Sequence, residues 1–253
     1  MKKSNKSIFG SKTSIISVKA RRREKSKIKR AMTNVCLVFD DGFAQSCSEI
    51  AKIFEARGLR ASFAVLVDSS DIFPNLKKGD FDLWNEFQER GHIIDPHGYD
   101  HSDLSKIPFG DAKVKIDACL DYFTLHLQGF DAGRSIYHLT YNRSTPQVDQ
   151  YLLTKFQAIR TTGPKGRVGS GMNNEDELSR RIYNCAWMGP DRCDEHLNSC
   201  LKLAELKKPK LFMYMLHGLD NEGWGPIGSN TLKKVLDYLL ESSELNYIDT
   251  SAI

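Results

Sequence analysis

Short apolar runs alternate with amphipathic segments from Val35 onward, and this alternation constrains the fold more than any other feature of the chain. Apolar runs of about four to eight residues are typical of buried strands, whereas apolar residues spaced three and four apart indicate helices. Strands that alternate with helices along a chain form parallel sheets, because each helix returns the chain across the sheet. The sequence therefore predicts an α/β domain.

The expected elements follow from this pattern. Strands are expected at residues 35–39, 61–67, 92–95, 135–141 and 211–216. Helices are expected at residues 46–57, 81–90, 112–128, 146–156 and 230–241. Gly58 and Gly91 follow two of these helices, a position at which glycine commonly ends a helix.

The first 31 residues differ from the rest in charge. They contain 12 lysine or arginine residues and one acid, Glu24. The whole chain has a formal net charge of +4, so residues 32–253 carry −7. We expect residues 1–31 to be a basic, disordered tail, or to reflect a start upstream of Met32, and residues 32–253 to form one folded domain. A nucleic-acid partner is not expected for the acidic folded domain, although the tail could bind nucleic acid or an anionic membrane.

Apolar runs and cysteines bear on localisation. No apolar run approaches the roughly 18 to 20 residues of a transmembrane helix, and the early run at residues 14–18 is too short for a secretory signal. We therefore expect a cytoplasmic protein without a transmembrane segment. The six cysteines form no Cys-x-x-Cys pair, which favours free thiols over disulfides among Cys185, Cys193 and Cys200. The sequence does not determine the oligomeric state.

Acids and histidines follow three of the expected strands. Asp40 and Asp41 follow the expected strand at residues 35–39. His97 and His101 follow the strand at residues 92–95, and His217 follows the strand at residues 211–216. In barrels of parallel strands, the active site forms at the carboxyl ends of the strands. Adjacent carboxylates at a buried strand end are costly unless a cation or proton compensates them. The alternative is a strand-to-helix turn with a capping aspartate.

The spacing of four between His97 and His101 places two imidazoles on one side of a helical turn. Such pairs also arise by chance on protein surfaces, so the spacing alone is weak evidence. Together with a carboxylate from the Asp-Asp-Gly segment, it supplies three protein ligands and leaves a position for water. This arrangement is typical of a catalytic divalent metal, with zinc favoured and cobalt or nickel able to substitute.

Three segments resemble the polysaccharide deacetylases related to the nodulation chitooligosaccharide deacetylase. They are Val-Phe-Asp-Asp-Gly at residues 38–42, Gly-His-Ile-Ile-Asp-Pro-His-Gly-Tyr-Asp-His-Ser at 91–102 and Leu-His at 216–217. The family has a Thr-Phe-Asp-Asp-Gly strand end, a His-Ser/Thr-x-x-His-Ser/Thr loop and a late Leu-His. The resemblance extends from residue 35 to about residue 250.

The resemblance implies a distorted, incomplete (β/α) barrel. It also implies an enzyme that removes acetyl groups from an N-acetylated sugar or polysaccharide, releasing acetate and a free amine. Carried over by position, it implies that Asp40 is the general base and His217 the general acid. It also implies that Asp41, His97 and His101 are the metal ligands and that the backbone N–H of Tyr141 binds the oxyanion. An O-acetyl esterase, a hydrolase of another small amide and a non-catalytic carbohydrate-binding relative remain alternatives.

The chain departs from the family mainly in the third motif. The family has Arg-Pro-Pro-Tyr-Gly or a close variant there, and this chain has His-Leu-Thr-Tyr-Asn at residues 138–142. The arginine that orients and tunes the base is therefore missing, and Arg143 is a candidate to replace it. Trp187 and Asp191 are the nearest candidates for a further Asp and Trp motif. Trp224 could stack on a sugar ring or pack within its loop.

Overall fold

The computed structural model describes residues 32–69, 73–163, 165 and 169–253. The predictions about the basic tail, residues 1–31, fall outside these residues. The strands are β1 (Thr33–Asp40), β2 (Ser62–Val65), β3 (Ile93–Pro96), β4 (Ile136–His138), β5 (Ala158–Arg160), β6 (Met172–Asn173), β7 (Ile182–Tyr183), β8 (Leu211–Leu216) and β9 (Leu245–Tyr247). The helices are α1 (Ala44–Glu55), α2 (Phe81–Glu89), α3 (Phe109–His126), α4 (Pro146–Leu153), α5 (Glu175–Arg180), α6 (Cys193–Lys207) and α7 (Ser229–Glu241).

The strands form two sheets. The first has the order β3-β2-β1-β8-β6, with β9 paired to the start of β1. The second has the order β4-β5-β7. Every ladder is parallel except the short pairing of β6 with β8. Parallel pairing requires crossover connections, and the predicted alternation of strands and helices supplies them.

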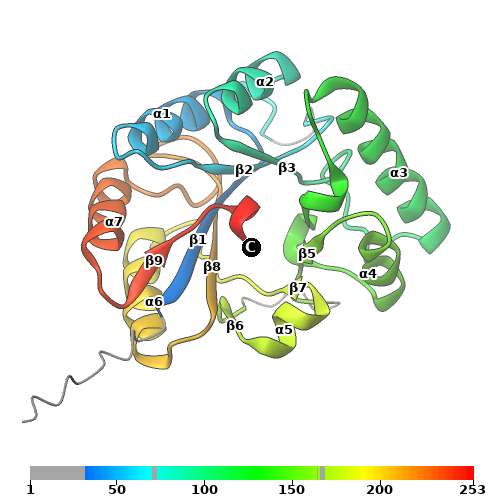
Figure 1. Ribbon diagram of the computed structural model, residues 1–253. Coiled ribbons are helices and arrows are strands. Elements are labelled where there is room, and N and C mark those ends of the chain that lie inside the picture. Colours follow the sequence, from blue (N-terminus) through cyan, green and yellow to red (C-terminus); the bar gives the residue numbers. More distant parts are fainter. Residues whose placement is uncertain (1–31, 70–72, 164, 166–168) are drawn as a thin grey trace, which may run out of the picture. The chain divides into compact units, whose positions relative to one another are not determined.

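The two sheets meet along two seams. At one seam, the Asp95 carboxylate at the end of β3 accepts a hydrogen bond of 3.2 Å from the backbone N–H of Ile136 in β4. At the other, Ala186 donates to Met213 at 3.0 Å and accepts from Met215 at 2.9 Å. The strands thus follow one another around a common interior with helices outside them (Figure 1). This arrangement confirms the predicted distorted, incomplete (β/α) barrel.

Alternation along the strands sorts side chains between the helices and the barrel interior. In β1, Val35, Leu37 and Phe39 belong to the larger apolar cluster, where the rings of Phe39 and Phe54 of α1 lie 5.8 Å apart. Cys36 and Val38 point the other way, into a smaller cluster with residues of the strands across the barrel. Because successive side chains face opposite sides of a strand, Asp40 is the next residue on the inward face.

The same alternation brings other polar residues to the interior. Ala158 of β5 and Met213 and Met215 of β8 belong to the inner cluster. Arg160 and His217 lie two residues after Ala158 and Met215, respectively, and both line up with the inward face. The parallel strands therefore carry Asp40, Arg160 and His217 to the same end of the barrel.

The C-terminal segment closes on the barrel from the other end. A short 3₁₀ helix, η3 (Thr250–Ala252), places Thr250 against Ser62, the first residue of β2, whose hydroxyl accepts a 3.0 Å hydrogen bond from the Thr250 N–H. The Thr250 hydroxyl donates to the second oxygen of Asp95 at 2.5 Å. Figure 1 shows this terminus at the centre of the ring of strands.

Most predicted elements are confirmed, with two kinds of difference. The strand predicted at residues 135–141 ends at His138, because Tyr141 and Asn142 have φ of +52° and +54°, which a strand cannot contain. The short strands β5, β6, β7 and β9 were not predicted, and the structure adds helices α5 and α6 to the five expected helix ranges. All six cysteines are free thiols, so the alternative of disulfides is wrong. Among the described residues, no helix is both long and apolar enough to cross a membrane.

Replacing Thr250 with alanine should destabilise the protein, because one oxygen of the buried Asp95 carboxylate loses its hydroxyl donor. We expect the free energy of unfolding to fall by about 1 to 3 kcal/mol, measured by urea denaturation. Thr124→Ala is the matched control, since that hydroxyl is exposed and donates to the Leu120 carbonyl of its own helix, and it should change stability by less than about 0.5 kcal/mol. An equal decrease in the free energy of unfolding in the two variants would show that the hydrogen bond from Thr250 to Asp95 does not stabilise the fold.

Candidate metal centre

A cavity of about 610 Å³ opens at the carboxyl ends of β1, β3 and β8. Its lining includes all six residues singled out from the sequence, namely Asp40, Asp41, His97, His101, Tyr141 and His217. The candidates Trp187 and Trp224 also line it, with ring centroids 5.4 Å apart, whereas Asp191 does not. The fold therefore gathers residues from four separate parts of the sequence at one site.

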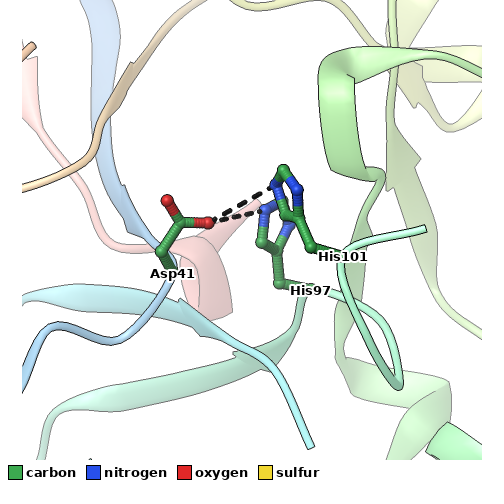
Figure 2. Close-up of side chains that lie close together, drawn as sticks. All are labelled: Asp41, His97 and His101. Carbon is green, nitrogen blue, oxygen red and sulfur yellow. Dashed lines mark ion pairs between the residues drawn. The ribbon is translucent and has the colours of Figure 1, made fainter. Parts of the chain in front are cut away.

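Asp41 is held in an unusual backbone conformation at the end of β1. Its φ is +72°, and the next residue, Gly42, also has φ of +72°. A side chain at Gly42 would be strained by this φ and would place a Cβ 2.8 Å from the Trp84 ring. This turn directs the Asp41 carboxylate toward two imidazoles. Its Oδ1 lies 3.5 Å from Nε2 of His97 and 3.6 Å from Nε2 of His101 (Figure 2).

The orientation of His97 is fixed by its other ring nitrogen. Nδ1 of His97 lies 2.8 Å from the backbone carbonyl oxygen of His138. A carbonyl only accepts hydrogen bonds, so Nδ1 carries a proton, and the neutral form of the ring presents its lone pair at Nε2. Burial alone would lower the pKa of His97, but the Asp40 and Asp41 carboxylates raise it. This contact is typical of histidines that bind metals. Burial, with the neighbouring His97 charge, lowers the pKa of His101 to about 4, which keeps this imidazole neutral at physiological pH.

The three facing atoms fit a divalent cation. Oδ1 of Asp41 is buried and makes no hydrogen bond to the described residues. The ligand atoms of Asp41, His97 and His101 lie within 4.8 Å of one another. Oxygen and nitrogen ligands about 2.1 Å from a tetrahedral zinc ion lie about 3.4 Å apart, close to the two nitrogen–oxygen distances observed. Two imidazoles and a carboxylate also form a ligand set common in catalytic zinc sites.

Asp40 has a different partner. The Arg160 guanidinium donates to both of its carboxylate oxygens, at 2.8 Å to Oδ1 and 2.6 Å to Oδ2. Both side chains are fully buried. Burial alone would raise the pKa of Asp40, but the charge and hydrogen bonds of Arg160, together with His97, hold that pKa well below its usual range. Asp40 is therefore an anion at neutral pH.

Arg160 is the residue that sequence reasoning missed. The arginine expected near Tyr141 is replaced by one on β5, a three-residue strand without a periodic pattern of its own. Arg143, the candidate considered from the sequence, instead contacts Asp103 at 3.1 Å, so that assignment is wrong. The available signal was an arginine directly after the apolar pair Ala158 and Ile159, which places a charge at the end of a short buried strand.

His217 and Tyr141 also line the cavity. His217 directly follows β8, is half-buried near Asp40 and Asp41, and has its Nδ1 buried and unpaired among the described residues. Its ring packs edge-on against Trp224, with centroids 5.1 Å apart. The ring of Tyr141 is half exposed and lies 4.5 Å from the ring of His101.

Comparisons with known proteins identify the family and the fold of the chain. The sequence model of the family described as polysaccharide deacetylase matches residues 27–157. No curated protein matches the chain. A chitin deacetylase from the fungal pathogen Colletotrichum lindemuthianum has a similar structure, with a TM-score of 0.58 and 17% identity over 87% of this chain and 86% of that chain.

Two further solved structures have the same fold. A family 4 acetyl xylan esterase from Clostridium thermocellum, in complex with a cobalt ion, has a TM-score of 0.56 and 12% identity over 87% of this chain and 89% of that chain. An allantoinase has a TM-score of 0.60 and 11% identity over 89% of this chain and 91% of that chain. At such identities, structural similarity establishes the fold and no more.

Replacing Arg160 with methionine should strongly destabilise the protein, because the Asp40 carboxylate would remain buried without its counter-charge. We expect a loss of about 3 to 5 kcal/mol in the free energy of unfolding, measured by chemical denaturation. The matched control is Arg143→Met, whose partly exposed pair with Asp103 should contribute less than about 1 kcal/mol.

A double-variant cycle tests whether Asp40 and Arg160 stabilise the protein as a pair. In an Asp40→Asn background, Arg160→Met should destabilise the protein by less than it does in the native background, because no carboxylate charge is left unpaired. Equal effects of Arg160→Met in the two backgrounds would show that the two side chains are not energetically coupled.

Proposed function

Because the chain belongs to the polysaccharide deacetylase family, we propose that it is a metal-dependent hydrolase of N-acetylated sugars or polysaccharides. The proposed reaction removes an acetyl group with water and releases acetate and a free amine. The observation that carries the proposal is the convergence of Asp41, His97 and His101 beside the ionised Asp40 in one cavity. A site that only bound carbohydrate would gain nothing from a buried carboxylate with its own arginine.

In this proposal, Asp41, His97 and His101 hold a divalent cation, with zinc favoured and cobalt or nickel as possible substitutes. When bound, such a cation polarises the acetyl carbonyl and lowers the pKa of water. The Nδ1 contact of His97 keeps its Nε2 aimed at Asp41. The unpaired Oδ1 of Asp41 provides the negative charge that a cation requires at this depth.

Asp40 is assigned the role of general base. Asp40 is the last residue of β1 and directly precedes Asp41, and Arg160 holds both of its carboxylate oxygens in a fixed plane. Oδ2 of Asp40 lies 3.6 Å from Nε2 of His97, so the base faces the proposed metal ligands. An ionised carboxylate in this position can accept a proton from the attacking water.

His217 and Tyr141 are assigned the later parts of the reaction. His217 lines the cavity with an unpaired buried nitrogen, which suits it to protonate the departing amine. The Tyr141 backbone N–H is assigned to the oxyanion of the tetrahedral intermediate, as a preorganised donor. Trp187 and Trp224 supply apolar walls on which an acetyl group or a sugar ring can pack.

Acetate release from a panel of acetylated carbohydrates tests the proposed function. We expect the purified, metal-loaded protein to release acetate from N-acetylglucosamine oligomers, and chelation of the metal should abolish this release. The amine product should appear in equal amount to acetate. Acetate release unaffected by a chelator would contradict metal dependence, and the absence of release from every N- and O-acetylated carbohydrate would contradict the function itself.

The two adjacent aspartates should respond differently to the same change. Asp41→Asn should lower both metal content and activity, because a neutral amide oxygen is a poorer ligand than a carboxylate. Asp40→Asn should retain the metal while lowering turnover by about 10²- to 10⁴-fold, as expected on removing a general base. Metal content is measured by elemental analysis, with the His97→Ala/His101→Ala double variant as the metal-free control. Retention of metal in Asp41→Asn together with its loss in Asp40→Asn would reverse the two assignments.

A further inference from the structure

Asn142 is a buried polar residue of the cavity to which the proposed mechanism gives no role. It follows Tyr141 and occupies the last position of the divergent third motif, where the resembling family has glycine. Only 1% of the residue is exposed, and it lines the cavity together with Asp40, His97 and His217. Its φ of +54° is a conformation that asparagine adopts more readily than most residues.

Both polar atoms of this side chain lack a hydrogen-bond partner among the described residues. Nδ2 and Oδ1 of Asn142 are buried and unpaired. Its backbone oxygen, by contrast, accepts from the N–H and hydroxyl of Thr162 at 3.0 and 2.9 Å, so the residue is firmly placed. Leaving a buried amide unpaired is unfavourable, and apolar or smaller residues avoid it. An unpaired amide in a substrate cavity therefore points to recognition of a polar group of the substrate.

The neighbours of Asn142 indicate which atom faces the substrate. The thiol of Cys185 lies beside its side chain, and a thiol is a weak hydrogen-bonding partner. Burial raises the pKa of Cys185 to about 12, while the Asn142 side chain acts against this rise, as an N–H donor to sulfur does. Nδ2 faces the sulfur in a contact that falls short of a hydrogen bond, and Oδ1 remains as an acceptor.

We propose that Oδ1 of Asn142 accepts a hydrogen bond from the N–H of the substrate's acetamido group, and so makes the site selective for N-acetyl over O-acetyl substrates. This inference rests on the proposed deacetylase function. An ester has an oxygen where the amide has its N–H, so an O-acetyl substrate offers Oδ1 of Asn142 no hydrogen-bond donor. Lone pairs of the ester oxygen and of Oδ1 would instead repel each other. The contact also strengthens as the departing nitrogen is protonated, which favours amide cleavage in the transition state.

A matched pair of substrates isolates this contact. 4-Nitroacetanilide and 4-nitrophenyl acetate differ only at the bond to be cleaved, where the anilide has an N–H and the ester has an oxygen. In Asn142→Gly, kcat/KM for the anilide should fall by about 10-fold, whereas kcat/KM for the ester should stay within about 3-fold of the native value. Glycine suits the positive φ of this position, so the variant should keep the fold and the metal, checked by thermal unfolding and elemental analysis.

Trp187→Phe provides the comparison within the same cavity. The Trp187 indole N–H is also buried and unpaired among the described residues, but it can only donate. Its removal should change kcat/KM for the anilide and the ester by the same factor. If the native protein is active and Asn142→Gly leaves the ratio of kcat/KM for the anilide to kcat/KM for the ester unchanged, the proposed role of Asn142 is wrong while the proposed function stands. A native protein inactive toward both model substrates and acetylated carbohydrates would instead overturn the proposed function, and this inference with it.

Discussion

The buried ion pair between Arg160 and Asp40 is the interaction on which the site depends. Neither side chain is exposed, and removing each charge from water costs several kcal/mol. The two hydrogen bonds of 2.6 and 2.8 Å offset this cost only while both groups keep their positions. Asp40 belongs to β1 of the larger sheet and Arg160 to β5 of the smaller one, so the pair also holds the two sheets in one arrangement.

This pairing explains how two neighbouring carboxylates can take the different parts proposed for them. Asp40 already has a full counter-charge in Arg160, so it does not require a metal ion. Asp41 faces the imidazoles of His97 and His101, and its inward oxygen makes no hydrogen bond to the described residues. A cation is therefore most strongly attracted to Asp41, while Asp40 remains an ionised acceptor beside it. The division of roles follows from which partner each carboxylate has, rather than from their order in the sequence.

The sequence was sufficient for the fold class and for the residues that follow long strands. The buried runs of β1 and β8 are long enough to show their pattern, and the acids and histidines at their ends could be placed at one face by the geometry of parallel strands. Arg160 could not be placed, because β5 has three residues and its partner lies 120 residues away. The left-handed turn at Tyr141 and Asn142 was also missed, since neither residue signals a positive φ as glycine does. The chemical roles assigned to the site residues stay predictions.

The register of β4 and β5 accounts for the displaced arginine. His138 stands at the position where the resembling family has its arginine, and its pairing partner across the parallel ladder is Arg160. Paired residues of neighbouring strands lie about 4.8 Å apart and point to the same face, so a long side chain from either can reach the same point in the interior. An arginine one strand away from the position it has in the family therefore pairs with Asp40, the proposed base. This leaves His138 buried on the inward face, with Nε2 only 3.5 Å from the Asp95 carboxylate and its carbonyl holding His97. The residue in the arginine position thus supports a proposed metal ligand through its backbone, while its strand neighbour supplies the charge.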